Sequence, residues 1–379
     1  MMVAEPPPLQ SPMPGTELDH WPPRIWLLLG YKAGDNAQIQ ALAAALGWPF
    51  DSKHIVYRRT ELLTNVLLGP TLAGIIESRS SPLAPPWPDV VISAGRRNEP
   101  VARWIRRQAG GRVRLVHMGR PWARLEQFDL IVTTPQYELP ERPNVLHNLL
   151  PLQRITAERL AAAASRWESC LAHLPPPRIA LLVGGNSGPY TLDRATAAYL
   201  GQTASKLAEQ GGGSLLVTTS ARTPRPAAAA LTAAVKAPAY CFQWTPHNDD
   251  DNPYLGYLAL ADAFIVTGDS ISMLTEACST CKPVYIFAPD EVVPGLEGGW
   301  RQRWERLRFD ALLHRLGVCL GLRQLRRDIG HIHRLLIASR RAVWLGQPFP
   351  PGPPLPPLED LARAAVRVQA LFAPPAGQK

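Results

Sequence analysis

Short, nearly continuous apolar runs alternate along this chain with longer stretches of helical periodicity. Each run ends in a turn rich in glycine or polar residues, and a helical pattern then begins. Strands that are apolar throughout and alternate with helices predict parallel sheets covered on both faces. The runs lie at 24–29, 54–57, 89–93, 114–118, 129–133, 178–183, 214–219, 239–244, 263–266 and 283–287.

The alternation occurs twice, which predicts two doubly wound, Rossmann-like α/β domains. It stops at a connector near 144–152 and starts again after three prolines at 175–177. A length of 379 residues is enough for two hydrophobic cores. The expected parts are a disordered leader at 1–22, domains at 23–150 and 151–345, an Arg-rich helix at 302–341 within the second domain, and a Pro-rich segment with a C-terminal helix at 346–379 that packs on the first domain.

The stretch 263–287 carries the strongest functional signal. It reads as a strand, the turn Thr267-Gly268-Asp269-Ser270, a helix and a second strand, which is a βαβ unit. Free backbone N–H groups and the positive end of the helix dipole at this turn suit a phosphate. Asp269 or Ser270 can cap the helix. Ser272 and Glu276 share one helix face, so Glu276 could accept hydrogen bonds from a sugar; a capped core helix with a solvated Glu276 is the alternative.

Two further turns of the second half are candidate phosphate contacts. Glycine in the first of them would let the backbone approach a ligand closely. The candidates are Gly184, Gly185, Asn186 and Ser187 in the first turn and Ser220 and Arg222 in the second. The chain has neither the G-x-G-x-x-G nor the G-x-x-x-x-G-K-[ST] pattern, which argues against Rossmann dehydrogenases and P-loop NTPases.

The first half offers a second cluster, which we assign to an acceptor. Asp35 follows the first strand and could act as a general base, although a helix N-cap is the more common use of such an aspartate. Arg96 and Arg97 follow another strand and could clamp an anion, with solvated surface arginines as the alternative. The expected acceptor contacts are Lys32, Gly34, Asn36, Arg96 and Arg97.

Other polar residues are weaker candidates. His147 lies in the connector and is a candidate acid or base, but a lone histidine is more often structural. The adjacent acids at 249–251 do not alternate as calcium ligands do. Cys278-x-x-Cys281 has no second cysteine pair to complete a zinc site, so we interpret it as structural. We therefore expect no metal site.

Composition narrows the list of partners. The net charge is +9, but 34 of the 40 basic residues are arginine and 40 residues are proline, which indicates a bias in the base composition of the genome. The charge is therefore weak evidence for a nucleic-acid partner. No basic run is interleaved with aromatic residues, so we expect no nucleic-acid partner. The charge is compatible with peripheral attraction to an anionic membrane. Five scattered cysteines, no signal-peptide pattern and no apolar run of ~20 residues predict a cytoplasmic protein, peripheral at the inner membrane at most.

Two resemblances add to this picture. The two-domain pattern with a returning C-terminal helix resembles the GT-B glycosyltransferase architecture, which implies a cleft between the domains. The segment 269–277 resembles the D-S-G-G-x-x-E-E-A segment of GT-B-fold UDP-N-acetylglucosamine 2-epimerases, in which it binds diphosphate and ribose. Ser270 and Glu276 match that pattern, whereas Ile271 and Ser272 stand where it has two glycines.

The chain as a whole resembles bacterial proteins related to a plant mitochondrial-fission factor, named for the elongated mitochondria of its mutant. Plant members act at the mitochondrial surface by recruiting a dynamin-type division protein, and bacterial members look like nucleotide-sugar enzymes. The segments that carry this resemblance lie at 30–36, 80–89, 95–97, 132–137, 184–190, 251–254 and 267–270.

These observations predict a GT-B-like protein that binds a nucleoside-diphosphate sugar. We expect a metal-independent glycosyltransferase with the nucleotide sugar as donor substrate, an unknown acceptor and no tightly bound cofactor. The alternatives are a nucleotide-sugar epimerase on the same fold and a non-enzymatic adaptor at a membrane or division site.

Overall fold

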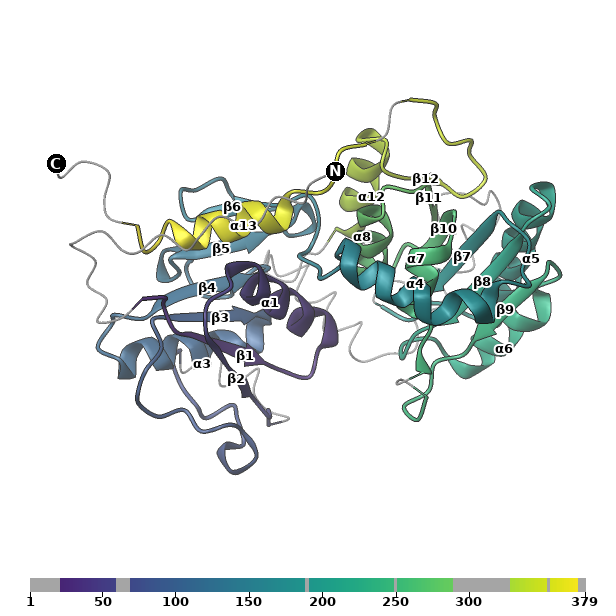
Figure 1. The fold of residues 1–379 in the computed structure, drawn as a ribbon. Coiled ribbons are helices and arrows are strands. Elements are labelled where there is room, and N and C mark those ends of the chain that lie inside the picture. The colour runs from purple at the N-terminus through teal and green to yellow at the C-terminus, as the bar shows by residue number, and fades with distance from the viewer. Residues whose placement is uncertain are drawn as a thin grey trace, which may run out of the picture. The chain divides into compact units, whose positions relative to one another are not determined.

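The computed structural model describes residues 21–58, 69–187, 191–248, 251–288, 328–352 and 355–373. These residues form two compact units, each built around a parallel sheet of six strands (Figure 1). Unit 1 comprises Met1–Thr134, Glu138–Asn148 and Glu359–Lys379, and unit 2 comprises Pro135–Tyr137 and Leu149–Leu358. The predicted α/β class with two doubly wound parallel sheets is confirmed.

The sheet of unit 1 has the strand order β2-β1-β3-β4-β5-β6, and every neighbouring pair is parallel. Its main helices are α1 (Ala33–Leu46), α3 (Gly95–Gln108) and α13 (Asp360–Gln369). Its strands are β1 (Ile25–Leu29), β2 (Phe50–His54), β3 (Val90–Ala94), β4 (Arg114–Met118), β5 (Leu130–Thr133) and β6 (Val145–His147).

The sheet of unit 2 has the order β12-β11-β10-β7-β8-β9, again with parallel pairs throughout. Its strands are β7 (Arg178–Val183), β8 (Ser214–Thr219), β9 (Ala239–Phe242), β10 (Ala263–Thr267), β11 (Val284–Phe287) and β12 (Val343–Trp344). Its helices are α4 (Ala157–Leu171), α5 (Arg194–Gln210), α6 (Arg225–Ala234), α7 (Tyr254–Leu260), α8 (Ile271–Ser279) and α12 (Ile329–Ala338).

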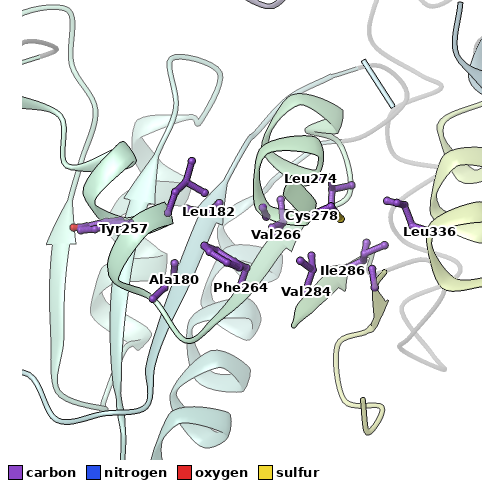
Figure 2. Packing of buried hydrophobic residues seen from close by; sticks show 14 of the residues in the cluster. Ala180, Leu182, Tyr257, Phe264, Val266, Leu274, Cys278, Val284, Ile286 and Leu336 are labelled. Carbon is purple, nitrogen blue, oxygen red and sulfur yellow. The ribbon is translucent and has the colours of Figure 1, made fainter. Parts of the chain in front are cut away.

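Both sheets bury apolar side chains on their two faces, which is why their strands read as continuous apolar runs. In unit 2, α5 and α6 pack on one face, while α7, α8 and α12 pack on the other (Figure 2). That second face gathers Ala180, Leu182, Phe264, Val266 and Ile286 from the strands. Each fully buried aliphatic or aromatic side chain contributes roughly 1.5–3 kcal/mol to folding.

Several predicted elements need correction. The second strand is Phe50–His54 rather than 54–57, and the connector at 144–152 contains the short strand Val145–His147. Helix α7 and strand β12 were not predicted. Most of the helix expected at 302–341 lies outside the described residues, as does almost all of the leader; the described end of the former is α12.

Helix α13 joins unit 1 from the far end of the sequence. It packs against α1 and β5 (Figure 1). Phe372, just after the helix, contacts the ring of Trp48 edge-on, with the ring centroids 5.4 Å apart. The Asn148 amide nitrogen donates to the Asp360 carbonyl oxygen at 3.2 Å. In the part of the chain that the structure describes, no helix is both long and apolar enough to cross a bilayer.

Candidate functional site

Strand order identifies one ligand position in each sheet. In unit 1 the chain passes from β1 to β2 on one side and then places β3 on the other side of β1. In unit 2 it runs outward from β7 through β8 to β9 and returns to place β10 on the other side of β7. Ligands of open α/β sheets bind beyond the carboxyl ends of the strands at such switch points. The loops after β1 and β3, and those after β7 and β10, are therefore the candidate sites.

The loops after β1 and β3 line a pocket in unit 1. The pocket is small, with a volume of about 30 Å³, compared with the roughly 10–15 Å³ that one water needs. It thus accommodates a compact chemical group rather than a whole nucleotide. The predicted residues that line it are Lys32, Asp35, Asn36, Arg96 and Arg97, and sequence reasoning missed Tyr31, Tyr57 and Asn98.

Two asparagines hold the walls of this pocket. The Asn36 side chain accepts from the Gly30 N–H at 2.9 Å and donates to the Gly30 carbonyl oxygen at 2.8 Å. Asn98 donates to the carbonyl oxygens of Leu28 at 2.8 Å and Ala94 at 3.2 Å, and accepts from the Tyr57 hydroxyl. Asn36, expected as an acceptor contact, therefore stabilises the turn that begins at Gly30 and carries Tyr31 and Lys32.

The pocket faces two helix N-termini that no side chain caps. Lys32 is the N-cap of α1 and Ala94 that of α3, and neither makes a side-chain capping bond. Both helices have 14 residues, so each presents unsatisfied N–H groups and about half a positive charge. By contrast, Thr156 caps α4, Asp193 caps α5 and Asp328 caps α12. Helices α6, α7, α8 and α13 also lack a side-chain capping bond.

Three cationic side chains and one carboxylate surround the same space. A Cβ on Gly95 would lie 2.8 Å from the Asp35 carboxylate, and Gly95 has a φ of +72°, so only glycine suits this junction. The Arg97 guanidinium lies 4.5 Å from the Tyr31 ring centroid and 5.9 Å from that of Tyr57. Tyr31 is 61% exposed, which leaves a ring face for a ligand. This combination favours a small anionic group next to an apolar or aromatic moiety.

Two predicted residues of unit 1 lie elsewhere. Gly34 is exposed in the first turn of α1 and does not line the pocket. His147 ends β6, which is separated from β3 by β4 and β5, and it pairs in register with Thr133. The structure thus does not bring His147 together with Asp35 in this pocket.

In unit 2 the predicted phosphate-binding turns contact one another. The Arg222 guanidinium lies 2.8 Å from the buried Asp269 carboxylate. Burial raises the pKa of Asp269, and Arg222 partly opposes that rise. A Cβ on Gly184 would lie 2.4 Å from an Asp269 carboxylate oxygen, so Gly184 is required for Asp269 to occupy this position.

The remaining groups of these turns are also engaged within the protein. The Ser220 hydroxyl donates to the Gly184 carbonyl oxygen, and the Asn186 N–H donates to the Arg222 carbonyl oxygen at 3.1 Å. The Asn186 side chain accepts from the Leu192 N–H at 3.0 Å. Ser187 is the last described residue of its turn. These contacts give Asn186, Ser220 and Arg222 a structural role in shaping the loop.

Helix α8 begins at the switch point of unit 2. Ser270 is its buried N-cap and makes no side-chain capping bond, while Ser272 is exposed. One turn further along, Glu276 is half-buried, and its Oε2 accepts from the Tyr254 hydroxyl. Burial raises the pKa of Glu276, and the bond from Tyr254 acts in the opposite direction.

Tyr254 and His333 are the residues of this region that motif reasoning did not assign. Tyr254 is the first residue of α7, a helix that the sequence pattern did not reveal. The His333 Nε2 lies 2.8 Å from the Gly268 carbonyl oxygen, and a Cβ on Gly268 would lie 2.8 Å from the imidazole. His333 therefore supports the turn that precedes α8. The segment Asn252-Pro253-Tyr254 was the available signal for Tyr254.

Solved structures with similar folds include an epimerase and a glycosyltransferase. The UDP-GlcNAc 2-epimerase of Methanocaldococcus jannaschii is 12% identical, with a TM-score of 0.46 over 92% of this chain and 99% of the epimerase chain. The ADP-heptose heptosyltransferase II of E. coli is 14% identical, with a TM-score of 0.40 over 70% of this chain and 86% of the transferase chain.

Sequence relatives come from plants and bacteria. The mitochondrial fission protein ELM1 of Arabidopsis thaliana is 28% identical over 260 residues, 61% of this chain and 56% of the plant protein. The chain thus spans little more than half of that relative. An uncharacterized protein of Rickettsia prowazekii is 24% identical over 304 residues, 70% of this chain and 83% of that protein. The sequence model described as Mitochondrial fission ELM1 matches residues 33–371, and the chain therefore belongs to this family.

Proposed function

We propose that this protein binds a nucleoside-diphosphate sugar in unit 2 and transfers the sugar, without a metal ion, to an acceptor held in unit 1. The observation that carries the proposal is the start of α8, where an uncapped helix N-terminus, two serines and a fixed carboxylate lie on one short segment. Backbone N–H groups there suit a diphosphate, and a carboxylate one turn away suits the hydroxyls of a ribose.

Glu276 is the residue on which donor binding depends. Tyr254 donates to Oε2 and so fixes the orientation of the carboxylate, which leaves Oε1 as the oxygen for a ribose hydroxyl. The N–H groups of the first turn of α8, with Ser270 and Ser272, would hold the diphosphate. Arg222 acts indirectly in this scheme, because its ion pair with Asp269 shapes the neighbouring turn.

The unit 1 pocket would orient the acceptor. Asp35 is held beside Gly95, where its carboxylate can accept the proton of an acceptor hydroxyl. The hydroxyl oxygen then bonds to the anomeric carbon of the donor while the bond from that carbon to the diphosphate oxygen breaks. The diphosphate leaves with the electron pair, and the N–H groups of α8 stabilise its charge. A chelator should leave turnover unchanged; loss of turnover that magnesium restores would contradict the metal-free step.

Donor binding is tested by thermal shift against a panel of nucleoside diphosphates and their sugars. A ligand at 100 times its Kd should stabilise the protein by about 2.7 kcal/mol. Glu276→Gln should weaken that ligand by roughly 1–3 kcal/mol, whereas Glu209→Gln, an exposed acid of the same unit, should not. Asp35→Asn should abolish transfer and leave donor affinity intact. Equal affinities of the Glu276 and Glu209 variants would remove Glu276 from the site.

Family membership favours a second candidate, a non-enzymatic adaptor at a membrane or division site, because the family is described by its part in mitochondrial fission. An adaptor of this kind needs no nucleotide, so the absence of a thermal shift with every member of the panel would favour it.

An epimerase would use the same donor groups and differs from a transferase in one measurable way. It would interconvert two nucleotide sugars when no acceptor is present.

A further inference from the structure

A second cavity lies in unit 2 at the opposite end of α8 from the donor groups. It is bounded by the last turn of α8 and the residues just before β11, by the residues that follow α12, and by residues 349–352 and 355. Cys278, at its wall, is the buried cysteine of α8 seen near Leu336 in Figure 2. The cavity volume is about 220 Å³, far above the roughly 10–15 Å³ that one water needs. It has room for a ligand of several heavy atoms.

One part of its lining is strongly cationic. Lys282, Arg340 and Arg341 line the cavity, and no aspartate or glutamate is among its described lining residues. These cations donate to uncharged backbone carbonyls: Lys282 to Ala259 at 2.8 Å and Ala261 at 2.6 Å, Arg340 to Pro351, and Arg341 to Pro356 at 2.8 Å. The Nη1 of Arg341 is buried and has no hydrogen-bond partner in the described structure. Buried charged donors are usually satisfied, so this one calls for an acceptor.

The negative ends of two helices do not balance this charge. α8 and α12 end beside the cavity, and each helix terminus is equivalent to roughly −0.5 charge. Three full positive charges therefore exceed the dipole contribution by about two. Burial raises the pKa of the Cys278 thiol to about 12, so this group is neutral and supplies no negative charge. Burial also lowers the pKa of Lys282, and the Asp262 carboxylate, which is not among the cavity-lining residues, partly opposes that shift.

The other part of the lining is apolar. Phe349, Pro350 and Leu355 form this wall. The Phe349 ring contacts Tyr285 of β11 in a T-shaped arrangement with centroids 6.2 Å apart, which attaches the Pro-rich chain to the sheet. The carbonyl contacts from Pro351 and Pro356 attach it to the arginines. The described residues of the Pro-rich segment thus form an apolar wall that is attached both to the sheet and to the arginines.

We propose that this cavity binds an amphipathic anion, a carboxylate or phosphate monoester that carries a short hydrocarbon chain. The anionic head pairs with Arg340 and Arg341, and the chain lies against Phe349 and Leu355. This site is distinct from the donor and acceptor sites proposed above and does not depend on them.

The test is isothermal titration calorimetry of the full chain with octanoate, octyl phosphate and octanol. At least one of the two anions should bind, and the tighter of the two identifies the preferred head group. Octanol should bind at least about tenfold more weakly than that anion, because it cannot pair with the guanidinium groups. Arg341→Gln should weaken the anion by at least roughly tenfold, and Arg341→Lys, which keeps the charge, should weaken it less. Arg334→Gln is the matched control, because this arginine of α12 pairs with Asp328 and does not line the cavity.

Folding is controlled by comparing the melting midpoints of the three variants. If Arg341→Gln destabilises the fold, two other measurements test the same ion pairing. Arg340→Gln should weaken the anion, and added salt should weaken anion binding to the wild-type protein. The proposal is overturned if neither anion binds, if octanol binds as tightly as the anions, or if the Arg341→Gln and Arg334→Gln proteins bind equally well.

Discussion

His117 is a buried histidine that no proposed site uses. It is fully buried on β4, and its Nδ1 lies 2.9 Å from the Ser93 hydroxyl. Burial lowers its pKa from 6.5 to about 3. Below pH 6.5 the unfolded chain therefore binds a proton that the folded chain does not, so stability falls as the pH falls. Between pH 7 and pH 5 this group should remove about 2 kcal/mol from the free energy of unfolding.

His117→Gln should reduce that acid sensitivity by the same amount, as measured by urea unfolding at several pH values. The quantity to compare is the slope of the free energy of unfolding against pH in each protein, because the substitution also changes the stability at pH 7. Burial lowers the pKa of His333 as well, but its contribution is common to both proteins and cancels. His54→Gln is the control, since His54 is exposed. An unchanged slope in His117→Gln would show that His117 does not titrate in this way.

Gly185 offers a second test at the scale of single residues. Its φ is +134°, and a Cβ would lie 2.3 Å from the Arg222 carbonyl oxygen, which is backbone and cannot turn aside. Gly185→Ala should therefore destabilise unit 2 by roughly 2–4 kcal/mol. Gly212 has a φ of +65° with open space around it, so Gly212→Ala should cost only about 1 kcal/mol. Urea midpoints measure both changes, and equal midpoints would contradict the close contact.

At the N-terminus of α1, a side chain that would stabilise the helix would also weaken anion binding in the pocket. Lys32 has the extended backbone of an N-cap but no capping side chain, so Lys32→Asp should stabilise α1 by about 0.5–1 kcal/mol. The same change removes a cation and adds an anion at the unit 1 pocket, so a small anion that binds there, with inorganic phosphate as the probe, should bind at least about tenfold more weakly. Thermal melting and calorimetry measure the two effects. Asp193→Ala, which deletes a cap in unit 2, should lower stability by about 1 kcal/mol and leave phosphate binding at the unit 1 pocket unchanged.

The elements that the sequence predicted well are those buried on both faces. Three strands have the observed bounds (Arg114–Met118, Arg178–Val183 and Ser214–Thr219) because a buried parallel strand is apolar along its whole length. The strand Phe50–His54 was missed because it lies at the sheet edge and is mostly exposed. The apolar residues chosen in its place follow the strand, and Ile55 among them is buried in the core.

The sequence predicted which loops carry the candidate residues better than it predicted the contacts that those residues make. Turns after apolar strands placed Lys32, Asp35 and Arg96 in one pocket, because parallel strands all end at the same sheet edge. The sequence could not show that Asn36 braces Gly30 or that Arg222 pairs with Asp269, since both depend on loop geometry. Tyr254 was missed for a similar reason, because its contact with Glu276 joins two residues that lie 22 positions apart on different helices.

At the scale of the whole molecule, the two units repeat one plan. Each has a six-stranded parallel sheet, and in each the direction of strand addition reverses beside the first strand. In both, the loops at that reversal carry an uncapped helix start, α1 and α3 in unit 1 and α8 in unit 2. The same topology thus provides two anion-compatible positions, and their side chains distinguish them: cations and rings in unit 1, hydroxyls and a carboxylate in unit 2.

The chain order of unit 1 leads to a prediction about the whole molecule. Its last helix, α13, buries Ala364 and Val368 and is followed by the contact between Phe372 and Trp48. A chain that ends at Leu358 should therefore destabilise unit 1 by about 3–5 kcal/mol, from lost apolar burial and one aromatic pair. Unit 2 keeps all of its described helices and strands in this truncation, so it should stay resistant to limited proteolysis while unit 1 is cleaved. A chain that ends at residue 373 retains α13 and should resist cleavage in both units; equal cleavage of the two truncated chains would show that α13 does not stabilise unit 1.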